Sequence, residues 1–198
     1  MADTYYTIQK EGEGLYREKM SRFLSFAVKV CSPSEAAEKI KQFQNRFHDA
    51  RHVCWAYMLG PKREIWQLND NGEPSGTAGK PILGQINSKG LTDVLVVVVR
   101  YFGGIKLGTS GLIVAYREAA KMALEDAGSI ECHEMKDFRA TFSYVDMNGV
   151  MTVVKNENVE IIEKNFDNLC TMMLRVRADF FDKIAGLLEK NGARIENF

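Results

Sequence analysis

The stretch Val94-Leu95-Val96-Val97-Val98-Val99-Arg100-Tyr101-Phe102 is followed directly by Gly103-Gly104-Ile105-Lys106-Leu107-Gly108. Branched apolar residues in an uninterrupted run predict a strand that is buried on both faces and lies in the centre of its sheet. Helical signals resume after the glycines, so we expect a helix from about Ser110 to Ala127 that ends at Gly128. The protein therefore contains both strands and helices, with a glycine-rich loop where its central strand ends.

The composition is that of an ordinary globular protein. Of its 198 residues, 45% are hydrophobic and 26% are charged, which argues against disorder. Lys+Arg and Asp+Glu are both 26, so the net charge is zero. A strong, non-specific nucleic-acid binder is usually basic overall, so any contact with RNA must come from a local patch.

Cysteine usage and hydropathy indicate a cytoplasmic protein. The four cysteines are far apart and include no C-x-x-C pair, so we expect small buried hydrophobic residues in a reducing compartment. Residues 1–6 lack the basic head and apolar core of a signal peptide. The longest apolar run, residues 94–99, is too short to span a bilayer, so we expect no membrane partner.

The first part of the chain alternates strand and helix patterns. Pro33 suits the first turn of a helix that runs to about His48, with Ser32 or Ser34 as the N-cap. Pro81 is expected to start a short helix that ends near Gly90. The expected strands, besides the central one, are residues 5–9, 22–30, 53–59 and 64–68.

After Gly128 a second pattern begins. Expected strands are residues 136–145, 159–166, 169–178 and 193–197, with a hairpin turn at 167–168. Two helices start after Asp146 and Asp179, which we expect to be N-caps. The resulting β-α-β-β-α-β order is the ferredoxin-like plan. We therefore expect an α+β protein with two domains, residues 1–130 and residues 136–198.

The glycine-rich loop after the central strand is a candidate anion site. Gly103, Gly104 and Gly108 let backbone N–H groups face outward, and the following helix adds a partial positive charge. Arg100 and Lys106 add side-chain charge. The spacing fits neither a P-loop nor a dinucleotide fingerprint, and a tight connection without a ligand is the alternative.

A second loop, residues 72–81, combines glycines with hydroxyl groups and a lysine just before an expected helix. Such a loop is a candidate phosphate cradle, and a purely structural loop is the alternative. The candidate phosphate- or RNA-binding residues of both loops are Ser75, Gly76, Thr77, Gly79, Lys80, Arg100, Gly103, Gly104, Lys106 and Gly108.

Three further residues, His52, Asp70 and Glu73, are expected to support this site. His52 and Cys54 share one strand face, which permits a nucleophilic pair, although a structural histidine is the simpler interpretation. Asp70 and Glu73 are general acid–base candidates that are more easily explained as ties within their own loop. Because no third orienting group can be assigned to the Cys–His pair, we expect no catalytic residue. The cysteines and histidines also lack metal-ligand spacing, and we expect no metal and no cofactor.

Three motifs resemble one protein family. They are G-E-P-S-G-T-A-G-K-P-I-L at residues 72–83, V-V-V-V-R-Y-F-G-G-I-K-L-G-T at residues 96–109, and A-Y-R-E-A at residues 115–119. Together with the second domain they resemble the bacterial two-domain branch of the IMPACT/YigZ family. Two departures from the family pattern are visible. Asn69 and Asn71 flank Asp70 where two adjacent aspartates are usual, and Thr109-Ser110 replaces part of a Gly-Gly pair.

The resemblance implies a fold and a function. The first domain is expected to be similar to domain two of small-subunit ribosomal protein five, with a left-handed βαβ crossover. The second is expected to be similar to the ferredoxin-like domains of elongation factor G. Eukaryotic relatives regulate translation by competing for a ribosome-associated activator of the amino-acid-starvation kinase.

The favoured hypothesis is therefore a translation-linked regulatory protein that binds RNA or the ribosome without catalysis. One alternative is a small-molecule enzyme that holds a phosphorylated or nucleotide substrate in the two loops. The other is an adaptor that binds a ribosome-associated protein.

Overall fold

The computed structural model describes residues 4–167 and 169–197. The chain forms two compact units. One comprises Tyr5–Cys132, and the other begins at His133 and also contains Thr4.

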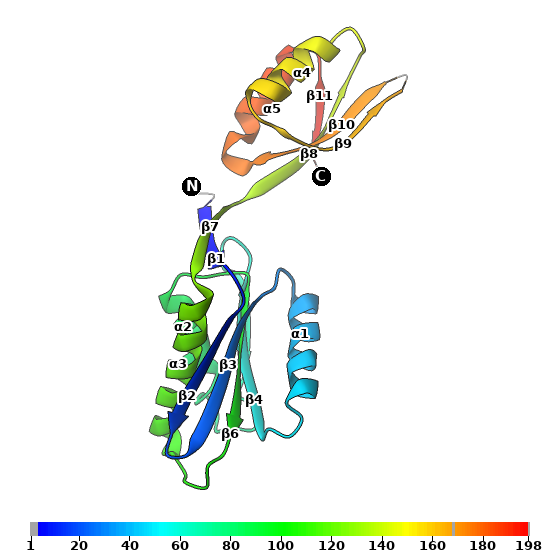
Figure 1. Cartoon of the computed structure of the whole chain (residues 1–198). Helices are drawn as coiled ribbons and strands as arrows, with labels where there is room; N and C mark the ends of the chain where they lie inside the picture. The colour runs from blue at the N-terminus through cyan, green and yellow to red at the C-terminus, as the bar shows by residue number, and fades with distance from the viewer. Residues whose placement is uncertain (1–3, 168, 198) are drawn as a thin grey trace. The chain divides into compact units, whose positions relative to one another are not determined.

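The first unit is built on a five-stranded sheet (Figure 1). In spatial order its strands are β2 (Gly12–Glu18), β3 (Ser21–Lys29), β6 (Val94–Tyr101), β4 (His52–Leu59) and β5 (Ile65–Asn69). Every pair of neighbours is antiparallel. The valine-rich strand β6 is central, and its residues from Val94 to Val99 have no exposed surface. The prediction for this strand is confirmed.

Helices cover both faces of this sheet, as Figure 1 shows. Helix α1 (Pro33–Arg46) covers one face, while α2 (Gly79–Ser88) and α3 (Gly108–Ala127) cover the other. Because side chains alternate along a strand, Val94, Val96 and Val98 join the core beneath α2 and α3. Leu95, Val97 and Val99 join the core beneath α1. An unbroken apolar run is therefore what this central strand requires.

The topology brings two loops to one edge of the sheet. Helix α1 connects β3 to β4, which run parallel to each other because both are antiparallel to the intervening β6. Strand β6 ends beside the start of β4, since Arg100 is the register partner of His52. The connection from β5 to α2 and the connection from β6 to α3 both leave the sheet at this edge. This edge positions the candidate site.

The predicted helix starts are partly right. Ser32 caps α1, because its Oγ accepts a hydrogen bond of 3.2 Å from the Glu35 N–H. Helix α1 ends at Arg46, two residues before the expected end, and α2 begins at Gly79 instead of Pro81.

Two strands were not expected from the sequence, namely β2 and β7 (Ser129–His133). Strand β7 pairs with β1 (Thr4–Ile8). Strand β2 carries glycines, which are usually depleted in strands. The glycines allow α3 to pack closely against β2, because a Cβ on Gly12 would lie 2.2 Å from the Ala123 carbonyl oxygen. The apparent weakness of β2 as a strand is thus a packing requirement.

The second unit has the expected β-α-β-β-α-β order. Its elements are β8 (Met135–Phe142), α4 (Met147–Asn156), β9 (Glu160–Phe166), β10 (Cys170–Arg177), α5 (Phe181–Lys190) and β11 (Arg194–Asn197). The antiparallel sheet has the order β11-β8-β10-β9. Both helices contribute to the core of this unit, with Val150 from α4 and Leu188 from α5.

Of the two N-caps predicted in the second unit, Asp146 is at the N-cap position of α4 but makes no side-chain cap, and Asp179 is not an N-cap. The Asp146 carboxylate accepts a 2.6 Å hydrogen bond from the Ser143 hydroxyl and caps no helical N–H group. Asp179 pairs with Arg177 inside a 3₁₀ turn, Ala178–Phe180, that precedes α5. Both carboxylates accept hydrogen bonds from nearby side chains instead of from the N–H groups of the following helix. The expected turn at 167–168 includes Asn168, which lies outside the described residues.

All four cysteines are free thiols in the structure. Cys54 and Cys170 are buried, whereas Cys31 is exposed and Cys132 is partly exposed, so the expectation of four buried thiols is wrong for these two. Within residues 4–167 and 169–197, no helix has the length and apolar character needed to cross a membrane.

Candidate functional site

The two loops enclose a cavity of about 450 Å³ at the shared edge of the sheet. Strand β4 begins there, strand β6 ends there, and α3 starts there. The lining residues come from all of these segments: Arg51, His52, Gly72, Glu73, Pro74, Arg100, Phe102, Lys106, Leu107, Gly108, Thr109 and Leu112.

The first loop is organised around Asp70. Its carboxylate accepts hydrogen bonds from the N–H groups of Gly76 (2.8 Å), Ala78 (3.0 Å) and Gly79 (2.8 Å). Burial by itself raises the pKa of Asp70, but these hydrogen bonds outweigh burial and hold the pKa below its ordinary value. Asp70 thus occupies the N–H groups that the sequence hypothesis assigned to a phosphate.

The side chains proposed as donors in this loop do not face the cavity. Thr77 is buried, and its hydroxyl donates to the Pro74 carbonyl oxygen at 2.6 Å. Ser75 and Lys80 are exposed and do not line the cavity. The tie predicted for Asp70 is present, whereas the phosphate cradle predicted around Gly76 and Gly79 is filled by the chain itself.

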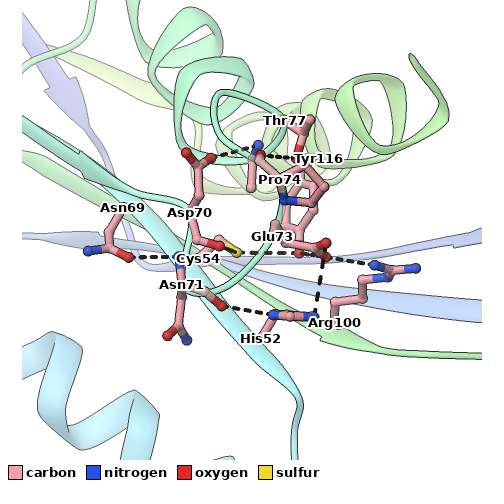
Figure 2. Close-up of polar contacts among 11 residues, drawn as sticks. His52, Cys54, Asn69, Asp70, Asn71, Glu73, Pro74, Thr77, Arg100 and Tyr116 are labelled. Atoms are coloured by element: carbon pink, nitrogen blue, oxygen red, sulfur yellow. Dashed lines mark hydrogen bonds and ion pairs between the residues drawn. The ribbon is translucent and has the colours of Figure 1, made fainter. Parts of the chain in front are cut away.

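Figure 2 shows a buried polar network behind the loop. Arg100 Nη1 lies 2.7 Å from Glu73 Oε1, and the Tyr116 hydroxyl donates to the same oxygen at 2.8 Å. The side chains of Arg100 and Glu73 are 7% and 3% exposed. Burial is the main cause that raises the pKa of Tyr116 above its ordinary value. This network ties the loop to β6 and to α3.

Aromatic rings surround the Arg100 guanidinium. Its central carbon lies 5.6 Å from the ring centroid of Phe23 and 5.5 Å from that of Phe102. Its Nε has no hydrogen-bond partner among the described residues. Among the described residues, Glu73 is the carboxylate that balances this positive charge, which is held in the cavity wall.

His52 is oriented by the first loop. Its Nδ1 lies 2.8 Å from the Asn71 carbonyl oxygen, which can only accept, so Nδ1 carries a proton (Figure 2). In the neutral ring, Nε2 is then an acceptor, and it lies 4.0 Å from Glu73 Oε2. A histidine held in one tautomer with its second nitrogen beside a cavity has the orientation of an acid–base group.

Cys54 does not form a pair with His52. Its Sγ lies 3.0 Å from the Asp70 carbonyl oxygen and 3.4 Å from the Tyr116 hydroxyl. Burial is the main cause that raises the pKa of Cys54 to about 12. The thiol stays protonated at neutral pH, so the nucleophilic alternative is not supported.

The second loop fits closely against the β2–β3 turn. The Gly103 N–H donates to Ser21 Oγ at 3.2 Å, and a Cβ on Gly103 would lie 2.1 Å from the Met20 carbonyl carbon. Gly104 and Gly108 have positive φ values of 89° and 71°. Of these glycines, only Gly108 lines the cavity, where it begins α3.

Positive charge predominates at the cavity. Arg51, Arg100 and Lys106 line it, against the single carboxylate of Glu73. The first turn of α3 lies beside them, and no side chain in the described part of the chain caps it. A helix N-terminus carries a partial positive charge, which adds to that of the three cations.

Sequence reasoning found part of this site. Five expected residues line the cavity, namely His52, Glu73, Arg100, Lys106 and Gly108. Eight do not, namely Ser75, Gly76, Thr77, Gly79, Lys80, Asp70, Gly103 and Gly104. Sequence reasoning missed Arg51, Phe102 and Tyr116 as site residues. The signals for them were their places beside His52, at the end of the valine run and inside the A-Y-R-E-A motif.

Comparison with known proteins agrees with these motifs. The family model described as the Impact N-terminal domain matches residues 19–124, which include both loops. IMPACT family member YvyE of Bacillus subtilis (strain 168) is 38% identical over 144 residues, covering 73% of this chain and 66% of that protein.

Two further bacterial relatives align over most of the chain. IMPACT family member YigZ of Escherichia coli (strain K12) is 33% identical, with coverage of 84% of this chain and 85% of that protein. An IMPACT family member of Haemophilus influenzae (strain ATCC 51907 / DSM 11121 / KW20 / Rd) is 32% identical, with coverage of 89% and 87%. A crystal structure of a hypothetical protein has the same fold, with a TM-score of 0.77 at 24% identity and coverage of 100% and 98%. The chain belongs to the IMPACT family.

Proposed function

We propose that this is a cytoplasmic, translation-linked regulatory protein that binds RNA or the ribosome and holds a phosphate group in the cavity. The observation that carries the proposal is the convergence of Arg51, Arg100 and Lys106 on the uncapped start of α3. Phosphate contacts from such groups position RNA and supply most of its affinity. The function needs no catalytic step.

The local charge balance supports an anionic ligand although the whole chain is neutral. Glu73 is already paired with Arg100, and the Asp70 carboxylate is enclosed by backbone N–H groups. Arg51 and Lys106 are exposed and free to contact a ligand directly, since no ion pair joins either side chain to another described residue. We propose that Arg100, which is already paired with Glu73, attracts an anionic ligand through its electric field at short range.

The expected fold likenesses of the two domains are also part of this proposal. We propose that residues 1–130 share the fold of domain two of small-subunit ribosomal protein five, with its left-handed crossover through α1. We propose that residues 136–198 are ferredoxin-like and similar to domains of elongation factor G. The sheet order β11-β8-β10-β9 supports the second assignment. Both likenesses favour a role beside the ribosome, by analogy of fold.

Co-sedimentation with ribosomes across a salt series tests the function. The variants are Arg51→Ala, Lys106→Ala and their double mutant, with Lys62→Ala as the control of equal charge. Lys62 is exposed in the β4–β5 turn, at the opposite end of β4 from the cavity. Arg100 is left intact because its loss would strand the buried Glu73 charge.

We expect salt-sensitive binding that is weakened in Arg51→Ala and Lys106→Ala, lost in the double mutant and unchanged in Lys62→Ala. Salt-insensitive binding that persists in the double mutant would contradict phosphate recognition, and would indicate a ribosome-associated protein as the partner.

The orientation of His52 favours a second candidate, an enzyme that acts on a phosphorylated or nucleotide substrate. His52 Nε2 would exchange a proton with a ligand in the cavity. A panel of nucleotides and sugar phosphates, screened by thermal shift and then by turnover, tests it with His52→Asn as the comparison. Turnover that the variant lacks would support the enzyme, while a panel without any thermal shift would remove its basis.

A further inference from the structure

Phe102 is an exposed aromatic residue at the mouth of a positively charged cavity. Its side chain lines the cavity and is 43% exposed. It directly follows β6, so the rigid central strand of the sheet fixes its position. An aromatic ring exposed to this degree in a cavity wall offers a flat apolar surface to a ligand.

The ring of Phe102 is in contact with Arg100 and is still partly exposed. The guanidinium carbon of Arg100 lies 5.5 Å from the ring centroid and covers one face. The ring centroid of Phe23 lies 5.6 Å from the same guanidinium carbon, and Phe23 is fully buried. Phe102 nevertheless keeps 43% of its surface exposed, so part of its ring is accessible to a stacking partner.

The cavity has the volume of a small-ligand site. At about 450 Å³ it lies within the range of roughly 300–1,000 Å³ that such sites span. That space is large enough for a single nucleotide unit. Bases of unpaired RNA stack on aromatic side chains, whereas bases of an A-form duplex are hidden from them.

We propose that the cavity binds one unpaired nucleotide of a single-stranded RNA. The phosphate lies against Lys106, Arg51 and the first turn of α3, and the base stacks on the exposed part of the Phe102 ring. This assignment rests on the proposed function and adds to it the class of RNA and a base-binding residue. Because every base has a π-face, stacking of this kind selects unpaired RNA without selecting its sequence.

The test measures fluorescence anisotropy with three labelled probes: a short single-stranded RNA, the same RNA made abasic throughout, and the corresponding duplex. The variants are Phe102→Leu, which removes the ring, and Phe102→Trp, which keeps an aromatic face. Ile105→Ala is the matched control, since Ile105 is 48% exposed on the same loop and does not line the cavity. Urea denaturation of each variant establishes that it is folded.

We expect Phe102→Leu to weaken binding of the single-stranded RNA about tenfold, in line with the loss of one stacked base. Phe102→Trp and Ile105→Ala should bind it like the wild type. The abasic RNA and the duplex should bind more weakly than the single-stranded RNA, and Phe102→Leu should not weaken the abasic RNA further.

Two results would overturn the inference, and they differ in what they imply for the function. Equal binding of the base-containing and abasic RNAs, still reduced by Lys106→Ala, would remove the stacking role and leave the phosphate site intact. No binding of any RNA, with no effect of Lys106→Ala on ribosome association, would overturn both proposals.

Discussion

Arg100 Nη1 lies 2.7 Å from Glu73 Oε1, and both side chains are more than nine-tenths buried. Arg100 is the penultimate residue of the central strand, whereas Glu73 belongs to the first glycine-rich loop. The pair therefore links the two loops of the cavity through the most buried strand of the sheet. Tyr116 completes the link by donating from α3 to the same Glu73 oxygen.

Arg100→Met is expected to lower the free energy of unfolding by about 3–5 kcal/mol, because Glu73 then remains buried without its counter-charge. Glu73→Gln should also destabilise, since it leaves Arg100 unbalanced. The double mutant should lose about 0.5–3 kcal/mol less than the sum of the two single losses. Urea denaturation measures all three, and strictly additive losses would mean that the pair is not coupled.

Asp70→Asn is expected to destabilise the protein at neutral pH by about 1.5–3 kcal/mol, because a charged acceptor of three N–H groups becomes neutral. Since the folded-state pKa of Asp70 lies below its ordinary value of 3.8, this stabilisation is full above that value. It is lost as the pH falls through the folded-state pKa. Urea denaturation from about pH 7 to about pH 3 should show the wild type and the variant converging in acid. A gap that stays constant over this range would contradict the role of Asp70.

Gly103→Ala is expected to cost about 1–3 kcal/mol, because its Cβ would overlap the Met20 backbone, which cannot give way as a side chain can. Gly84→Ala is the comparison, since Gly84 lies inside α2 and, beyond the adjoining helix backbone, no atom of the described residues lies within 4 Å of the added Cβ. That variant should gain about 0.5–1 kcal/mol of stability. Thermal denaturation compares the two, and equal effects would show that the close approach at Gly103 is relaxed in solution.

The thiols are expected to differ in reactivity. Iodoacetamide near pH 8 should modify Cys31 first, because it is exposed. Cys54 should react only after unfolding, since burial raises its pKa to about 12 and it belongs to the core beneath α2 and α3. Peptide mass spectrometry over time identifies each modified residue. Fast modification of Cys54 in the folded protein would restore the nucleophilic hypothesis.

Much of the fold could be predicted because its signals are local. The valine run from Val96 to Val99 indicates a central strand, and Ser32 followed by Pro33 indicates a helix start. Strand β2 could not be predicted, since a glycine is needed at Gly12 to let Ala123 of α3 pack closely, and Ala123 is distant in the sequence. Asp146 and Asp179 have the residue type of N-caps, but neighbouring donors bind them instead.

The candidate site, like the fold, could be predicted only where its signals are local in the sequence. The glycine-rich loops themselves are recognisable, and Arg100 and Lys106 were assigned to the site. Sequence alone does not distinguish an external phosphate from an internal carboxylate, since either satisfies the same N–H groups. Only the fold shows that Asp70 fills the first loop, and that the start of α3 is left without a cap.

The most direct test of the central claim is the salt dependence of binding to a short single-stranded RNA, compared between the wild type and Arg51→Ala/Lys106→Ala. A phosphate contact on a single strand contributes about 0.7 to the slope of log affinity against log salt. The account predicts that the double mutant binds more weakly and that its slope is smaller by about 0.7–1.4, while Lys62→Ala leaves both unchanged. An unchanged slope and affinity in the double mutant would contradict the placement of RNA phosphate in the cavity.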